Sequence, residues 1–138
     1  MYHKITNLKF KRLRHWLSAP FILGMIIPLV LFDISMEIYH RIAFPLYGLA
    51  SVKRGEYIKI DRHRLPYLSF LNKIWCAYCG YANGLAAYWV AIAGRTESYW
   101  CGIKHQPSPH FHEPLHQKDF LTYGDERAYQ EYCKLRDK

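Results

Sequence analysis

The stretch SFLNKIWCAYCGYANGLAAYWVAIAGRTESYW, residues 69–100, has the spacing of one long helix and organises the C-terminal half of the chain. Apolar side chains recur in it at intervals of three and four residues, as on one face of a helix. The clearest part of this stripe consists of Tyr78, Tyr81, Leu85 and Tyr88. Helix propensity is lowered at Gly80, Gly84 and Gly94, so the pattern also allows a break over residues 79–84. We expect the stripe to lie in a core or against a partner rather than to line a cofactor.

Two pairs of metal-ligand residues belong to this region. Cys76 and Cys79 form a CxxC pair inside the helix pattern, and Cys101 and His105 follow directly after it. The combined pattern C-x2-C-x21-C-x3-H suits tetrahedral Zn²⁺, whose structural sites often use three cysteines and one histidine. A turn after Trp100 would bring the second pair back to the first. We therefore predict a metal site at these four residues, with zinc as the first candidate and iron as the alternative.

Other cysteine chemistries fit the pattern less well. Attachment of a c-type haem requires His directly after the CxxC pair, where this chain has Gly80. A thioredoxin-like pair lies at a helix start after a strand, whereas apolar helix-like sequence precedes Cys76. Disulfides that join Cys76 or Cys79 to Cys101 or Cys133 become an alternative if the head lies outside the cytoplasm. Free buried thiols are a further alternative. We expect Cys133 to be a packing residue.

The N-terminal third predicts a membrane segment. Residues 1–15 form a basic segment without an acid, and residues 16–32, WLSAPFILGMIIPLVLF, carry no charge. An uncharged run of this length is at the lower limit for a spanning helix. In one topology a helix from residue 16 to about residue 39 crosses the membrane. In the other, which we favour, the segment bends near Pro28 and returns, so that both basic flanks face the cytoplasm. A buried helix of a soluble protein is a third, less favoured interpretation.

The continuation of this membrane segment to residue 50 is amphipathic. Asp33, Glu37 and His40 fall near one helical face, and Pro45 and Gly48 end the pattern. Glu37 and His40 form a Glu-x-x-His pair of the kind used in di-iron bundles, which need a second copy from a partner or a homodimer. We expect instead a polar face that contacts lipid head groups or another subunit.

The remaining residues, 51–138, predict a small head. At this size a hydrophobic core alone is marginal, so a metal, a disulfide or a partner would stabilise it. We expect a short strand or extended arm over residues 52–65 and a short helix over residues 125–138, with Gly124 and Asp125 near its N-cap. The predicted fold is mostly α, with an N-terminal membrane helix, spanning or re-entrant, and a small metal-stapled helical head.

A histidine-rich loop separates the two helices of the head. Besides His105 it contains His110, His112 and His116, and its three prolines disfavour a helix. The letters HEPLH, residues 112–116, match the zinc-protease motif, but Pro114 lies inside a motif that needs an unbroken helix. We expect these histidines to make hydrogen bonds and partner contacts, with a second transition-metal site as the alternative.

The charge of the chain points to an anionic partner. The net charge is +8 with neutral histidines, and cations gather on both sides of the apolar segment. Basic clusters beside a membrane segment usually face anionic lipid head groups. No nucleic-acid-binding motif accompanies the charge, so we expect anionic lipids rather than nucleic acid. Aromatic residues make up 17% of the chain, and such residues favour membrane interfaces and protein contacts.

Five short stretches of the chain together carry a family resemblance. They are EIYHRIAFPLYGL, IDRHRLPYL, CAYCGYANGL, RTESYWCGIKH and KDFLTYGDE, and they cover most of residues 30–127. With them the chain resembles a family of small bacterial membrane-associated proteins that have a CxxC…CxxxH pattern and no settled activity. The resemblance implies a bacterial origin and an inner-membrane setting. It carries over no catalytic residue, so the ligand assignment above depends on spacing alone.

These observations lead to one functional expectation and one alternative. We expect a membrane-anchored accessory or assembly subunit of a larger bacterial inner-membrane complex, with its head on the cytoplasmic side. Its partners would be other membrane subunits or further copies of the chain. The alternative is a membrane-bound iron metalloprotein, either an electron carrier or a redox enzyme. No catalytic constellation is complete in the sequence, so the expectation favours a protein without enzyme activity.

Overall fold

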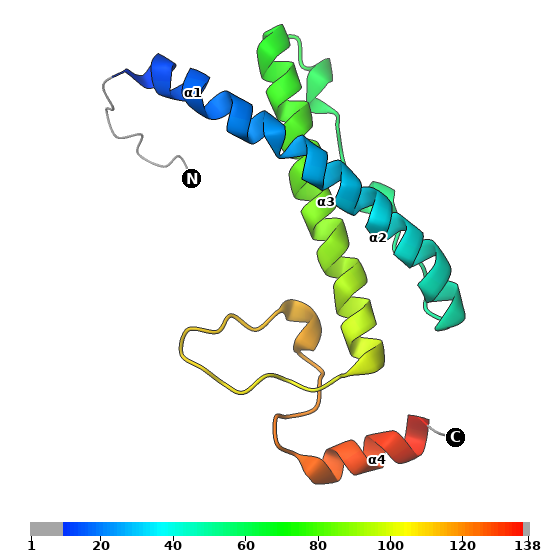
Figure 1. Ribbon diagram of the computed structural model, residues 1–138. Coiled ribbons are helices and arrows are strands. Elements are labelled where there is room, and N and C mark those ends of the chain that lie inside the picture. Colours follow the sequence, from blue (N-terminus) through cyan, green and yellow to red (C-terminus); the bar gives the residue numbers. More distant parts are fainter. Residues whose placement is uncertain (1–9, 137–138) are drawn as a thin grey trace. The chain divides into compact units, whose positions relative to one another are not determined.

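The computed structural model describes residues 10–136, and this range is mostly helical without a β-strand (Figure 1). The predicted mostly α class is confirmed. The helices within it are α1 Lys11–Gly24, α2 Ile26–Leu46, α3 Phe70–Trp100 and α4 Glu126–Arg136. Short 3-10 turns lie between them, namely η1 Arg54–Glu56, η2 Arg62–Arg64 and η3 Leu115–Gln117. The chain divides into two compact units after Ile38. Residues 1–9 of the predicted basic segment lie outside the described residues.

α1 and α2 form one nearly continuous apolar helix with an interruption at Met25. The interruption has a local cause, because Pro28 has no N–H to donate to the carbonyl oxygen of Gly24, four residues earlier. Helical bonding resumes at once, since the amide of Leu29 donates to the Met25 oxygen at 3.2 Å. Within residues 10–136, the span Leu13–Leu46 is long and apolar enough to cross a membrane, with a mean hydropathy of 2.2 over an 18-residue window.

α2 runs on in the direction of α1 (Figure 1), so the predicted bend and return near Pro28 is not found. The apolar side chains of this helix point outward, and Trp16, Phe21 and Ile27 are each more than half exposed. None of the apolar window is buried against other parts of the chain, so the interpretation as a buried helix of a soluble protein is not met. The helix has the surface expected of one that lies in lipid.

α2 ends in a complete cap at the place that the sequence predicts. The amide of Leu49 donates to Phe44 and the amide of Gly48 donates to Pro45, which are the two hydrogen bonds of a Schellman motif. Gly48 has a φ of 68°, which a residue without a Cβ adopts without strain. The last turns of α2, from Tyr39 onward, belong to the second compact unit. The second unit, which contains the head, therefore starts at Tyr39, and the boundary at residue 51 that composition indicates stays a prediction.

α3 is unbroken from Phe70 to Trp100, so the break that its glycines allow does not occur. The Ser69 hydroxyl caps its first turn by accepting a hydrogen bond from the amide of Asn72 at 3.4 Å. Serine at this position offers the backbone a partner that it would otherwise lack. The long helix expected from the spacing of apolar residues is confirmed.

The glycines of α3 provide a seat for the segment at residues 57–59, which we call the arm. A Cβ added to Gly84 would stand 2.7 Å from the carbonyl oxygen of Tyr57, and one added to Gly80 would stand 2.9 Å from that of Lys59. Gly80 and Gly84 lie about one helical turn apart, so together they let the backbone of the arm approach α3 closely. Of the two expectations for residues 52–65, the short strand does not occur, and the extended arm is found between η1 and η2.

The core of the second unit lies where the end of α2 meets the middle of α3. From α3 it contains Leu85, Tyr88 and Ile92, which are almost fully buried and extend the predicted stripe. The end of α2 and the segment after it contribute His40, Ala43, Phe44 and Val52. The expectation that this stripe packs in a core is confirmed for its C-terminal half.

A loop of residues 102–125 connects α3 to α4 and is closed at its base. The amide of Lys104 donates to Leu121 and the amide of Leu121 donates to Gly102, both at 2.8 Å. α4 begins after Asp125, whose carboxylate accepts a hydrogen bond from the amide of Ala128 at 3.0 Å. The predicted terminal helix and its cap are therefore confirmed as far as residue 136, and residues 137–138 of the prediction lie outside the described residues.

Candidate functional site

The four predicted zinc ligands do not lie together. Cys76 and Cys79 are near the start of α3, whereas Cys101 is its C-cap and His105 follows in the loop. Because α3 is unbroken, the distance from Cys79 to Cys101 along the helix is about 33 Å. No group of three or more metal-binding side chains occurs among residues 10–136, and all four thiols are free. A metal-stapled head is therefore not shown by the described residues. Cys133 is half-buried, as expected of a packing residue.

His40 is buried in the head and is hydrogen-bonded at both nitrogens. Its Nε2 accepts from the backbone amide of Val52 at 3.0 Å, so this nitrogen carries no proton. The proton lies on Nδ1, which donates to the Tyr88 hydroxyl at 3.1 Å. The ring also packs edge-on against Phe44. The predicted role of His40 in lipid or partner contact, or in a metal site, is wrong, because both nitrogens are engaged inside the core.

Asp33 and Glu37 precede His40 on α2 but belong to the first compact unit. Both are half-buried. Lipid or partner contact by Asp33 and Glu37 stays a prediction.

Glu97, His116 and Gln117 form a polar contact between the last turns of α3 and η3, which we call the clasp. The Glu97 carboxylate accepts hydrogen bonds from His116 Nε2 at 2.6 Å and from Gln117 Nε2 at 2.7 Å. The His116 ring lies directly against Gly94, where a Cβ would stand 2.8 Å from the ring. Hydrogen bonds to a carboxylate are stronger than those between neutral groups. The clasp therefore fixes the middle of the long loop on the end of α3.

Gln117 is the most deeply buried member of the clasp. It is 2% exposed, and its side-chain oxygen accepts no hydrogen bond from the described part of the chain. The amide cannot turn round, because the Glu97 carboxylate needs a donor. A buried acceptor without a partner costs about 1–3 kcal/mol.

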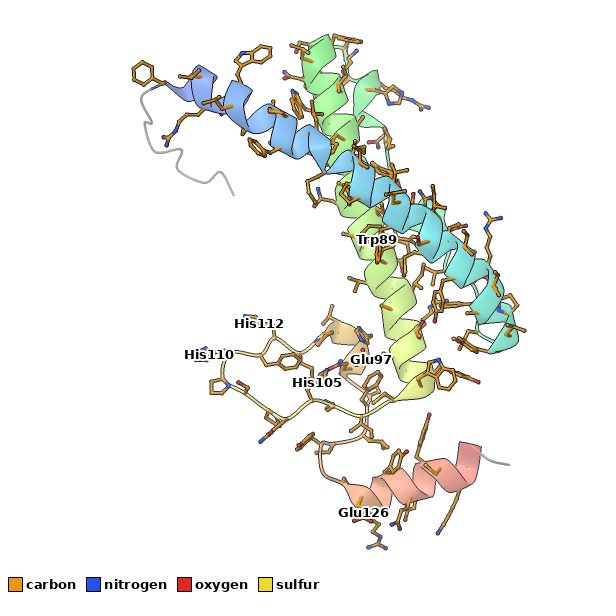
Figure 2. The ribbon with its side chains drawn as sticks, viewed as in Figure 1. Trp89, Glu97, His105, His110, His112 and Glu126 are labelled. Carbon is orange, nitrogen blue, oxygen red and sulfur yellow. The ribbon has the colours of Figure 1, made fainter. Side chains whose placement is uncertain are left out.

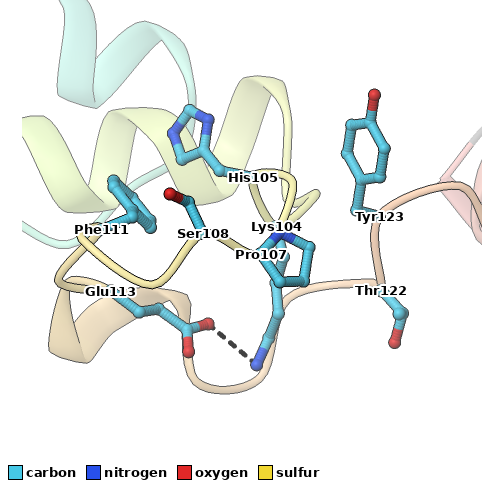
Figure 3. A pocket seen from close by; sticks show the side chains of 8 residues that line it. All are labelled: Lys104, His105, Pro107, Ser108, Phe111, Glu113, Thr122 and Tyr123. Carbon is cyan, nitrogen blue, oxygen red and sulfur yellow. Dashed lines mark ion pairs between the residues drawn. The ribbon is translucent and has the colours of Figure 1, made fainter.

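A pocket of about 250 Å³ opens in the loop after α3 (Figure 3). Lys104 and Glu113 form an ion pair across it at 2.9 Å, and Ser108 also lines it. His105 connects the pocket to the clasp, because its Nε2 lies 4.0 Å from a Glu97 oxygen. The volume is below the range of about 300–1,000 Å³ that is usual for small-molecule sites. The pocket suits a single side chain of a partner better than a cofactor.

The two other histidines of the loop point away from the clasp. His110 and His112 lie on its outer bend (Figure 2), and both are exposed. The helical turn begins only after Pro114, so His112 and His116 do not share a helix as a zinc protease requires. The expected hydrogen-bonding role is confirmed for His116. For His110 and His112, partner contact stays a prediction.

The sequence did not predict a functional role for Glu97 or Gln117. One signal for Glu97 was present, because it is the single acid between Asp61 and Glu113, within a long apolar helix. Gln117 gave no signal. Glu97 holds the proton of His116 on Nε2, which leaves Nδ1 as an acceptor or base. Nδ1 lies against Gly94, where an added Cβ would stand 3.0 Å from it. We therefore interpret the contact between Glu97 and His116 as one that positions η3 on α3 rather than as a catalytic pair.

Comparison of the chain with protein families, with curated proteins and with solved structures returned no match.

Proposed function

We propose that this protein is a membrane-anchored accessory or assembly subunit of a larger bacterial inner-membrane complex. The observation that carries the proposal is the helix Leu13–Leu46, which presents apolar side chains outward and continues into the head. The bacterial inner membrane is proposed from the sequence resemblance. A structural zinc, or the alternative iron centre, would need ligands from more than one chain, because the residues expected to hold it lie at opposite ends of α3.

The C-terminal end of the head offers a surface for a protein partner. Large apolar side chains are exposed on the last turn of α3, the loop and α4, namely Trp100, Phe111, Leu115, Tyr123, Tyr129 and Leu135. Leu115 is 95% exposed although it lies two residues from the buried Gln117. The clasp and the hydrogen bonds at the base of the loop hold several of these side chains in place. Exposed apolar groups on a fixed backbone favour an interface.

The cysteines support a head on the cytoplasmic side. All four thiols are free, and Cys79 and Cys101 are exposed. Exposed free thiols persist in a reducing compartment and become oxidised outside it.

The partner can be tested by site-specific photo-crosslinking in native membranes. A photo-reactive residue at the position of Leu115 is expected to give a discrete crosslink to another membrane-associated protein. The same residue at the position of Lys53, which is exposed but outside the proposed surface, is the matched control and should give none. Equal, diffuse labelling from both positions, together with migration as a single chain in mild detergent, would contradict the subunit role.

The side of the head can be tested with the natural thiols. A membrane-impermeant maleimide is expected to label Cys79 and Cys101 only after the inner membrane is opened. Labelling in cells whose inner membrane is intact would place the head outside the cytoplasm and refute this part of the proposal.

A further inference from the structure

α3 carries a second apolar surface, at its N-terminal end. The stripe that is buried at Leu85, Tyr88 and Ile92 continues toward the start of the helix at intervals of three and four residues. The positions of this continuation are Tyr81, Tyr78, Ile74, Leu71 and Phe70. The exposed fraction rises along it, from 0% at Ile92 to 77% at Phe70. One stripe therefore has a half in the core and a half on the surface.

The exposed half lies beside cations, and the acid next to them in the sequence, Asp61, forms an ion pair with Lys59 at 3.6 Å. η2 packs against α3 and brings Arg62 and Arg64, both exposed, to this helix (Figure 1). No Asp or Glu occurs between Asp61 and Glu97. The first turn of α3 also lacks the acidic residue that commonly balances the helix dipole. Leucine and aromatic side chains beside arginines are the composition of a surface that lies at a bilayer interface.

We propose that Tyr67, Phe70, Leu71 and Ile74, together with Arg62 and Arg64, form a second membrane contact that binds the surface of an anionic phospholipid bilayer. The charge of this surface complements phosphate head groups, and its apolar side chains can enter the boundary between head groups and acyl chains. The C-terminal end of the head differs, because acids return there from Glu97 onward. A surface with both charges is better suited to a protein.

The contact rests on the proposed anchoring, because the anchor keeps the head close to lipid and raises its effective concentration at the bilayer. Each arginine at an anionic surface strengthens such a contact about fivefold, so the pair contributes about twenty-five-fold. The effect is screened by salt. The composition of the bilayer and the ionic strength should therefore both change how often the N-terminal end of α3 touches the membrane.

Hydrogen–deuterium exchange of the full chain in nanodiscs tests this contact. One set of discs contains phosphatidylcholine alone, and the other also contains phosphatidylglycerol. We expect amides of residues 67–74 to exchange at least tenfold more slowly in the anionic discs, and the difference to shrink at high salt. The double variant Arg62→Gln/Arg64→Gln should remove the difference. The double variant Arg127→Gln/Lys134→Gln, which removes the same charge from α4, should keep it.

Each other outcome of this experiment overturns the inference. Equal exchange in both discs would show that no anionic lipid is bound. Slow exchange in both discs that the arginine variant leaves unchanged would show apolar contact without charge recognition. Protection that requires a co-purified protein would assign the surface to a protein partner. Flotation with vesicles separates the two proposals, because a chain that floats and shows no lipid-dependent protection keeps its anchor and lacks the second contact.

Discussion

Replacing Gly84 by Ala tests how closely the arm approaches α3. Helix propensity and crowding by the arm would change the free energy of unfolding in opposite directions. Replacing Gly84 by Ala in an open helix would raise stability by about 1 kcal/mol, because alanine has the higher helix propensity. In this structure the new Cβ would stand 2.7 Å from the Tyr57 carbonyl oxygen and 2.8 Å from the Ile58 Cα. Both neighbours are backbone atoms, so no side chain can swing aside. The arm would have to move by about 0.7 Å to reach ordinary van der Waals contact.

Such overpacking costs about 1–3 kcal/mol, and the upper value applies where only backbone can yield. After the gain in propensity, Gly84→Ala should lower the free energy of unfolding of the head by about 2 kcal/mol. For a unit of this size, that lowers the melting temperature by about 8–16 °C. Circular dichroism of the detergent-solubilised chain during heating measures the shift. Ala86→Gly, at an exposed position of the same helix, is the control and should cost about 1 kcal/mol. A Gly84→Ala protein that melts above the parent would refute the seating of the arm.

Three further predictions concern the clasp, the buried histidine and the cysteines. Glu97→Gln should lower the free energy of unfolding by about 1–2 kcal/mol, because the clasp loses its charge-assisted bonds; unchanged melting would mean that the loop is held elsewhere. His40→Leu should cost about 1–3 kcal/mol, because the Val52 amide is left without its acceptor, and proton exchange of that amide followed by NMR should accelerate. The stability effects of Cys79→Ser and Cys101→Ser should add to within about 0.5 kcal/mol in the double variant, and strong coupling would instead support a shared metal.

The elements that the sequence predicted well depend on local signals. The spacing of Leu85, Tyr88 and Ile92 follows from helix geometry, which each stretch of chain carries within itself. The caps at Gly48 and Asp125 are likewise local, because each satisfies backbone groups within a few residues. These signals located α3, α4 and the end of α2 without knowledge of the rest of the chain.

The elements that the sequence did not predict depend on contacts between distant segments. From the sequence, Gly84 only lowers the helix propensity of α3. Its role in letting the backbone of the arm approach the helix becomes visible only in the folded structure. The spacing of Cys79 and Cys101 fits a zinc site only if the chain turns back between them, and an unbroken α3 prevents that. Glu97 likewise accepts its hydrogen bonds from two residues of η3, His116 and Gln117, and the sequence of α3 alone does not indicate these partners.

The hydrogen bond between His40 and Tyr88 also sets an order of events while the chain is being made. His40 leaves the ribosome 48 residues before its partner does. At a synthesis rate of about 5–20 residues per second, this gap lasts about 2–10 s. During that interval His40 and Phe44 lack the side chains of α3 that complete their packing, although the apolar helix before them is already made. The anchor can therefore enter the bilayer before the head can close, and the head then completes its core beside a membrane rather than in free solution.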